Sequence, residues 1–421
     1  MSCRVALTAA TIGAGLTLAV SAQQPAPATV SVDVRLQTAV SSPGSKPGDA
    51  VTATVLGLPG DSLAVASGCV VTGTVRPTPK AAGIGDRHTL ALTFDAVRDR
   101  LGVSHPLTAT LVRVDNAREA VADGVVLGLA VVRARPPAIE AFLMLAAHAH
   151  PITLAAAEAV RLGVKATERP AIEFHPGVRL SLAVRPDPVL PTLDCDGPRT
   201  TRAAPDAATT AWALAQPIRA QAGEPPREAD WINLIAVGTR DALERAFLSA
   251  GWETADRVSV RVDVRTFFAV MEREQYQTGP VSTLKLAGAS PALVFQKQTN
   301  TFAKRHHVRW WPAATPTPDG RTAWVGAATH DIGLEFSRIT KHYTHRIDGA
   351  IDDERRSLLA DLGSVNHLET FGFAPRSTVP AASTNATGDK VTTDSAVAVF
   401  QVTASAAPAA AAREASAGRR P

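Results

Sequence analysis

Aromatic residues are scarce in this chain of 421 residues. They make up 5% of the sequence, against 45% for hydrophobic residues as a whole. Alanine, valine, threonine, proline and glycine are abundant instead, a composition that favours strands and turns over long helices. The chain is too long for one ordinary domain, since about 150 residues per domain suggests two or three domains.

Several motifs of well-known chemistry are missing as well. The sequence has no Gly-x-Ser-x-Gly elbow, no Gly-x4-Gly-Lys phosphate loop and no Gly-x-Gly-x-x-Gly dinucleotide loop. The HExxH and CxxC metal spacings are also missing. The pI is near 9.1, but no basic stripe with interleaved aromatic residues marks a nucleic-acid surface. We therefore expect neither nucleotide-driven chemistry nor a nucleic-acid partner.

The first 22 residues have the layout of a secretory signal peptide. A positive start at residues 1–4 precedes an uncharged, mostly apolar stretch at residues 5–20. Small residues before Gln23 offer a cleavage site after Ala22. A membrane anchor is the alternative, but the stretch is short, and a span needs about 20 strongly apolar residues. We therefore expect an exported protein, periplasmic or secreted, with no transmembrane span after cleavage.

Signal cleavage would leave Cys69 and Cys195 as the remaining cysteines. In an oxidising compartment these two residues could form one disulfide, and two separate buried thiols are an equally good interpretation. The sequence does not decide between the two. Cys3 lies too early to be a lipidation cysteine that follows a signal.

Residues 31–185 predict an antiparallel β-barrel or β-sandwich. Short runs of alternating apolar and polar residues, such as residues 51–55 and 107–111, are separated by turn residues. Residues 138–164 predict a helical insert within this module. The charged segment 115–119 is expected to be a solvated turn.

A linker rich in Pro, Ala, Thr and Arg is predicted at residues 186–230. It leads to a C-terminal α+β domain at residues 231–402, with a mixed or antiparallel sheet. The domain opens with a buried strand, and Thr239 can cap the following helix, which Gly251 ends. Residues 403–421 are of low complexity, and we expect them to be disordered.

Six of the 11 histidines fall between His306 and His367, among arginines, tryptophans and carboxylates. The segments that carry this chemistry are residues 305–311 (RHHVRWW), 324–331 (WVGAATHD) and 344–348 (THRID). In a strand, alternate side chains face opposite sides. One face of the first segment would then hold Arg305, His307, Arg309 and Trp311, and the other His306, Val308 and Trp310. In the second segment, one face would hold Trp324, Gly326, Ala328 and His330.

Taken in order, these segments resemble the LssY C-terminal domain family. The resemblance covers about residues 231–373 and includes Asn233-Leu234, Gly251-Trp252 and the charged residues at 352–355. It implies a domain without a settled activity. In that family the domain sometimes follows membrane segments or a lipid-phosphatase-like module, whereas here a β-rich module precedes it.

One hypothesis for the histidine-rich region is a site for a divalent metal such as zinc. Neutral imidazoles and carboxylates are common ligands of that ion. The candidate ligands are His306, His307, His330 and His345, with Asp331 as a carboxylate.

A second hypothesis is an anion site in which Arg305 and Arg309 bind a phosphate or carboxylate bidentately. The full set of ligand-binding candidates is Arg305, His307, Arg309, Trp310, Trp324, Asp348 and Arg355. An imidazole that titrates near neutral pH could then act as acid or base, with an aspartate orienting the ring. The catalytic candidates for such a hydrolase, with a phosphoester as the first substrate class, are His330, Asp331 and His345.

The alternative is a non-catalytic scaffold or adaptor of the cell envelope. Arg, His, Trp and Asp in strands also form cation–π layers and ion-pair networks. Asp352, Asp353 and Glu354 suit a helix N-terminus, where negative charge is favoured. The expected partner is a small anionic ligand, phosphate- or lipid-related, or an envelope component, and association with a membrane surface is compatible with either.

Overall fold

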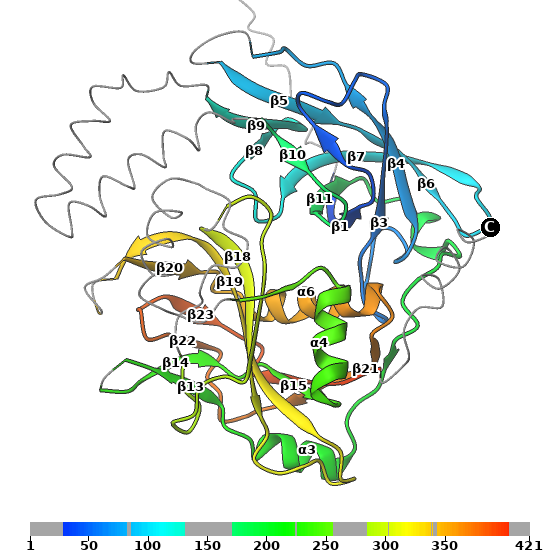
Figure 1. Ribbon diagram of the computed structural model, residues 1–421. Helices are drawn as coiled ribbons and strands as arrows, with labels where there is room; N and C mark the ends of the chain where they lie inside the picture. Colours follow the sequence, from blue (N-terminus) through cyan, green and yellow to red (C-terminus); the bar gives the residue numbers. More distant parts are fainter. Residues whose placement is uncertain are drawn as a thin grey trace, which may run out of the picture.

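The computed structural model describes residues 28–81, 86–130, 171–223, 225–255, 284–301, 303–337, 339 and 343–403. The predicted signal peptide, the predicted helical insert at residues 138–164 and residues 404–421 of the predicted tail lie outside these ranges. Within them the chain forms two β-rich modules, one above the other in Figure 1. No helix of the described residues is long and apolar enough to cross a membrane.

The N-terminal module is a closed antiparallel barrel. The strand order is β3-β1-β11-β7-β6-β4, and β3 also pairs with β4, which closes the ring. These strands are β1 (Val30–Leu36), β3 (Ala50–Val55), β4 (Val70–Arg76), β6 (Phe94–Arg98), β7 (Ser104–Val114) and β11 (Arg179–Val184). Further strands of the module are β2 (Val40–Ser41), β5 (Arg87–Leu92), β8 (Ala120–Ala122), β9 (Val125–Ala130) and β10 (Glu173–Phe174). Of the two predicted folds for this module, the barrel is confirmed.

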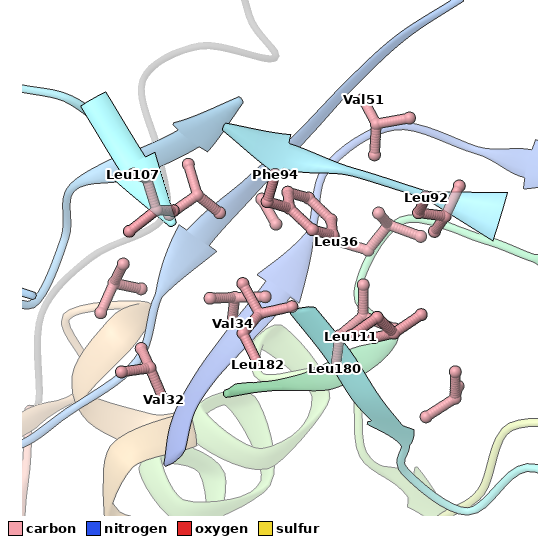
Figure 2. Close-up of a cluster of buried hydrophobic side chains, with 14 of the residues drawn as sticks. Val32, Val34, Leu36, Val51, Leu92, Phe94, Leu107, Leu111, Leu180 and Leu182 are labelled. Atoms are coloured by element: carbon pink, nitrogen blue, oxygen red, sulfur yellow. The ribbon is translucent and has the colours of Figure 1, made fainter. Parts of the chain in front are cut away.

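Period-two patterning fills the barrel with aliphatic side chains. In β3 the buried positions are Val51, Ala53 and Val55. In β1 they are Val32, Val34 and Leu36. Figure 2 shows side chains of several strands meeting in this core, among them Phe94, Leu107, Leu111, Leu180 and Leu182. Removal of this apolar surface from water, at roughly 25 cal/mol per Å², is the main stabilising contribution.

The C-terminal module is built on a mixed sheet of order β12-β21-β24-β15-β19-β18-β17-β16, with β20 paired to β19. The pairs β15–β24 and β12–β21 are parallel, and the others are antiparallel. The central strands are β15 (Leu234–Val237), β18 (Lys304–Pro312), β19 (Ala323–Phe336), β21 (Leu368–Pro375) and β24 (Ala396–Val402). The edge strands are β12 (Thr201–Arg202), β16 (Glu253–Thr254), β17 (Leu293–Lys297) and β20 (Tyr343–Ile347). The hairpins are β13 (Arg219–Ala222) with β14 (Arg227–Trp231), and β22 (Ala382–Thr384) with β23 (Lys390–Thr392).

Two helices, α4 (Arg240–Ser249) and α6 (Ile351–Ser364), cover one face of this sheet. As predicted, Thr239 caps α4, because its side chain accepts a hydrogen bond from the backbone N–H of Ala242. Gly251 follows the helix with φ +79°, a left-handed conformation that favours glycine. Strands nevertheless predominate in the described residues, so the expected α+β description applies only loosely and the module is mostly β.

The segment 186–230, predicted as a linker, is not a bare connection. It contains the short helices η1 (Leu190–Thr192) and α3 (Ala207–Leu214), and its strand β12 joins the edge of the mixed sheet. The composition misled the prediction, because Pro- and Ala-rich sequence also forms short elements when they can pack on a neighbour. The segment also carries Cys195, which forms a disulfide with Cys69 of the barrel, the alternative that the sequence left open.

A buried carboxylate joins the two modules. Asp361 of α6 accepts hydrogen bonds from Arg35 at 2.9 Å and Arg179 at 2.6 Å, both on barrel strands. From the C-terminal module it accepts from Lys297 at 2.8 Å and from the indole of Trp252 at 3.1 Å. The modules therefore share a polar interface, and Figure 1 shows α6 at the level where they meet.

Candidate functional site

Strand β18 separates the predicted site residues into two groups. Val308 and Trp310 face the core formed with α4 and α6, whereas Trp311 faces the core on the opposite side of the sheet. His306 lies on the first side and contacts Glu354 of α6, as the alternation predicts. Its pairing partner on β19 is His330.

The first group lies where the barrel meets the sheet. The Nε2 atom of His306 is 2.7 Å from an oxygen of Asp115, which comes directly after barrel strand β7. Its Nδ1 atom is 2.5 Å from Glu354 Oε2. The ring of His330 stacks on that of His306 with 4.2 Å between centroids. The Nε2 atom of His330 lies 2.9 Å from Asn116 Oδ1.

We call Asp115, Asn116, His306, His330 and Glu354 the junction site. Its two stacked histidines differ in charge. Burial lowers the pKa of His306, but the carboxylates of Glu354 and Asp115 outweigh it and raise the pKa to about 10. For His330, burial and the neighbouring charge of His306 lower the pKa to about 4. At neutral pH, His306 is therefore a cation between two carboxylates, and His330 is a neutral imidazole.

A pocket of about 570 Å³ opens beside these histidines. Its walls come from both modules, and its volume suits a small molecule. The ionisable residues that line it are Asp33, Asp61, Arg113, Asp115, Arg179, His306, His330, Asp348, Asp353, Glu354 and Arg356. The side chains of Arg113 and Arg356 are 50% and 44% exposed, so both are accessible from solvent.

The second group lies on the opposite side of the sheet and is a buried ion-pair network. Asp331 accepts from Arg305 at 3.1 Å and contacts His307 at 2.9 Å and His345 at 3.2 Å. Burial raises the pKa of the Asp331 carboxyl, but His307, His345 and Arg305 together outweigh it and keep the pKa well below its usual range. Arg309 donates to Asp230 at 3.1 Å. The cavity beside this network measures about 80 Å³, too small for most ligands.

The metal ligands predicted from sequence therefore do not converge on one point. His306 and His330 meet at the junction, whereas His307 and His345 meet at Asp331 behind the sheet. The catalytic set is divided in the same way, since Asp331 and His345 lie together and His330 does not join them. The cause is the two-residue period of β18 and β19, which sends adjacent side chains to opposite faces.

The predicted anion grip is also not available in this arrangement. Arg305 and Arg309 are buried and bound to aspartates, so their charge is already neutralised. Arg355 is likewise buried, with its guanidinium on Asp394 and 4.9 Å from the ring centre of Phe373.

The remaining ligand-binding candidates divide between the core and the pocket. Trp310 and Trp324 are core residues. Asp348 lines the junction pocket, where its Oδ1 also accepts from the backbone N–H of Ala350.

The structure corrects two predictions about residues of the junction site. The segment 115–119, predicted as a solvated turn, is buried at Asp115 and Asn116, which are 4% and 5% exposed. Glu354, predicted as a surface charge of a helix N-terminus, is 4% exposed and contacts His306. One signal was available: consecutive Asp and Asn suit a left-handed turn, and Asn116 has φ +52°.

The junction site also has the composition of a metal site. Asp115, His306 and His330 each offer one ligand atom, and these atoms lie within 4.8 Å of one another. A carboxylate with two imidazoles is a ligand set that zinc and other transition metals accept. Among the described residues, this is the one group of three or more such ligands that lie within this distance.

Comparison with known families supports one part of this description. Residues 218–397 match the family described as LssY C-terminus, which confirms the resemblance predicted for the C-terminal domain. The match begins at hairpin β13–β14 and ends within β24, so it includes strands β18, β19 and β20, which carry both histidine groups. Asp115 and the barrel lie outside it. No curated protein matches the chain.

Proposed function

We propose that this LssY C-terminus domain and the barrel in front of it form an exported cell-envelope protein that binds a small anionic ligand between them. The observation that carries the proposal is the pocket of about 570 Å³, whose polar walls come from both modules. Pockets at module interfaces are common ligand sites. The proposed ligand bears a phosphate or carboxylate group, free or as a lipid headgroup.

Two arginines at the pocket support an anionic ligand. Arg113 binds Asp115 at 2.9 Å, and Arg356 pairs with Asp61. A guanidinium has five N–H donors, and the pair with Asp61 does not use all those of Arg356. The remaining donors of Arg356 can bind a ligand. The carboxylates that line the pocket oppose an anion, and a cation in the site would offset them.

Export is supported by two features. The first 22 residues have the layout of a signal peptide, and Cys69 and Cys195 form a disulfide, a bond typical of oxidising compartments. Cell fractionation and the mass of the purified protein test this part directly. A mature chain that begins at Gln23 is the expected result, and an uncleaved chain in the cytoplasm would contradict it.

Ligand binding is tested by calorimetric titration of the full mature chain. One probe is inorganic phosphate and the other is vesicles of glycerophospholipid, each with and without Zn²⁺. Arg356→Ala is expected to weaken binding about 10-fold or more, the loss expected for a charge-assisted hydrogen bond of about 1.5–3 kcal/mol. Arg100→Ala is the matched control, because Arg100 also forms an exposed pair with an aspartate but lies outside the pocket. Equal binding by both variants would exclude this pocket.

If the protein is also an enzyme, we expect the site to hydrolyse a bound phosphoester. His330 is a neutral imidazole at the pocket, and its lowered pKa of about 4 makes it a weak base near neutral pH. Turnover of a phosphomonoester and a phosphodiester by the same protein samples tests whether the site is catalytic. The second candidate is a scaffold without ligand, and the observation that favours it is the network around Asp331, which is buried and internally paired. A scaffold predicts neither binding nor turnover in any of these titrations.

A further inference from the structure

We infer that Asp115, His306 and His330 form a binding site for one divalent transition-metal ion, with Zn²⁺ as the first candidate. The inference rests on the proposed function only through the pocket, because these three residues are part of its lining. It differs from the metal set predicted by sequence, because it includes a barrel residue and omits both histidines behind the sheet.

The geometry of the three residues is close to that of a metal site. Their potential ligand atoms lie within 4.8 Å of one another. Zinc ligands about 2.0–2.2 Å from the ion lie roughly 3–4 Å from each other, so a small adjustment would place an ion among them. Asp115 already accepts from Arg113 with Oδ1, and its Oδ2 faces the Nε2 atom of His306. The protonated His306 would lose its Nε2 proton when the ion binds, since a metal takes the neutral form of the ring.

Glu354 supplies the second, independent observation. Its Oε2 contacts His306 Nδ1, the ring nitrogen opposite the one that faces Asp115. A histidine that ligates a metal almost always donates its other ring N–H to a carboxylate, a backbone carbonyl or a water, and Glu354 is a partner of the first kind. The other oxygen of Glu354, Oε1, is buried and has no hydrogen-bond partner among the described residues. This oxygen is a buried acceptor that a donor or a cation at the junction would satisfy.

Charge distinguishes this site from the group behind the sheet. There, Asp331 shares its two oxygens with His307, His345 and the guanidinium of Arg305, whose positive charge disfavours a cation. At the junction, Asp115 also binds one guanidinium, that of Arg113, but Asp348 and Asp353 line the same pocket, where carboxylates outnumber arginines. A divalent ion would offset this excess of carboxylates and could also bind an anionic ligand.

The coordination that results would be incomplete without both modules. Asp115 comes from the barrel, whereas both histidines come from neighbouring strands of the LssY C-terminus domain. Three protein ligands leave a fourth position open toward the pocket, the arrangement of catalytic rather than purely structural zinc sites. The ion would thus join the modules and complete the ligand pocket.

The test uses the full mature chain, stripped with a chelator and titrated with Zn²⁺ alone. We expect one equivalent per chain in the wild type by calorimetry and elemental analysis. Asp115→Asn and His330→Gln should each lose stoichiometric binding, and Glu354→Gln should weaken it about 10–100-fold through the loss of its support to His306. The matched control is His105→Ala, because His105 contacts Asp99 in the barrel at 3.2 Å without a second histidine.

Variants that fail to fold are covered by a measurement on the wild type. With ¹¹³Cd²⁺ bound to ¹⁵N-histidine-labelled protein, NMR should show coupling of one cadmium to two histidine rings. Failure of the wild type to retain an equivalent of metal, coupling to other than two rings, or full binding by folded Asp115→Asn and His330→Gln would overturn the inference. Phosphate binding that persists in chelator would then leave the proposed function standing, and metal binding without any anion binding would leave only the metal site.

Discussion

At the scale of single residues, Asp361 is a buried carboxylate that binds donors from both modules. It is 1% exposed and accepts from two barrel arginines, a lysine and an indole. Burial raises the pKa of this carboxyl, but Arg179, Lys297 and Arg35 outweigh it and hold the pKa well below its usual range. The residue therefore stays ionised inside the protein and holds one buried and two partly buried cations in place.

Removal of this charge should be strongly destabilising. Asp361→Asn removes the counter-charge of Lys297 and the nearer of the two carboxylates on buried Arg179, which costs about 3–5 kcal/mol of the free energy of unfolding. Urea denaturation followed by circular dichroism measures the change. Asp194→Asn is the control, because its pair with Arg100 is exposed on both sides and should contribute about 0–1 kcal/mol. Similar losses in the two variants would contradict the role of burial.

The same carboxylate predicts a pH dependence of stability. The folded pKa of Asp361 lies below its unfolded value of about 3.9. As the pH falls, the unfolded chain therefore takes up the proton before the folded protein does. Its stabilising contribution is present above about pH 4 and is lost as the pH falls further. Urea midpoints at pH 7, 4 and 3 should fall more steeply for the wild type than for Asp361→Asn. Parallel pH profiles would show that the carboxyl is not depressed.

At the scale of elements, strands β18 and β19, which carry His306 and His330, pack closely where a glycine of one strand faces a tryptophan of the other. Gly326 of β19 pairs with Trp310 of β18, and a Cβ atom at Gly326 would meet the indole ring at 2.5 Å. Trp310 is fully buried against Phe247 and Phe400, so its ring cannot move aside. The glycine is thus required by packing rather than by its backbone conformation.

Gly326→Ala should therefore destabilise the C-terminal module by about 1–3 kcal/mol, the usual cost of an overpacked core. Gly333→Ala, in the same strand, is the matched control, since a Cβ there meets nothing within 4 Å. Its effect should stay within about 0.5 kcal/mol. Thermal and urea unfolding of the two variants give the comparison, and an equal effect at both positions would exclude the contact with Trp310.

The elements also show what the sequence could predict. Alternation in residues 305–311 correctly placed His306 and His307 on opposite faces, because a strand has a fixed period of two. The pairing of β18 with β19 brought His306 beside His330, and no local pattern encodes that register. The prediction of one pooled histidine site failed at this step, although each strand was identified correctly.

At the scale of the whole molecule, the junction site depends on contacts between distant parts of the chain. His306 and Asp115 are 191 residues apart, and His330 and Asn116 are 214 apart. Composition and periodicity report on local structure, so they identified the barrel and the sheet but not their mutual orientation. The charged loop 115–119 has the local sequence of a solvated turn, and only its contact with the second module buries it. For this reason Asp115 was not predicted as a site residue.

The bond between Cys69 and Cys195 belongs to this largest scale, because it joins residues 126 positions apart and closes a loop that contains barrel strands β4, β6, β7 and β11. The mature double variant Cys69→Ser/Cys195→Ser should lose about 2–5 kcal/mol of unfolding free energy, since the open loop gives the unfolded chain more conformational freedom. Urea denaturation with and without reductant measures this loss. Reductant should lower the wild type to the level of the double variant and leave the variant itself unchanged, so the variant is its own control. Two titratable thiols in the exported wild type, or a wild type insensitive to complete reduction, would contradict the prediction and remove one of the two supports for export.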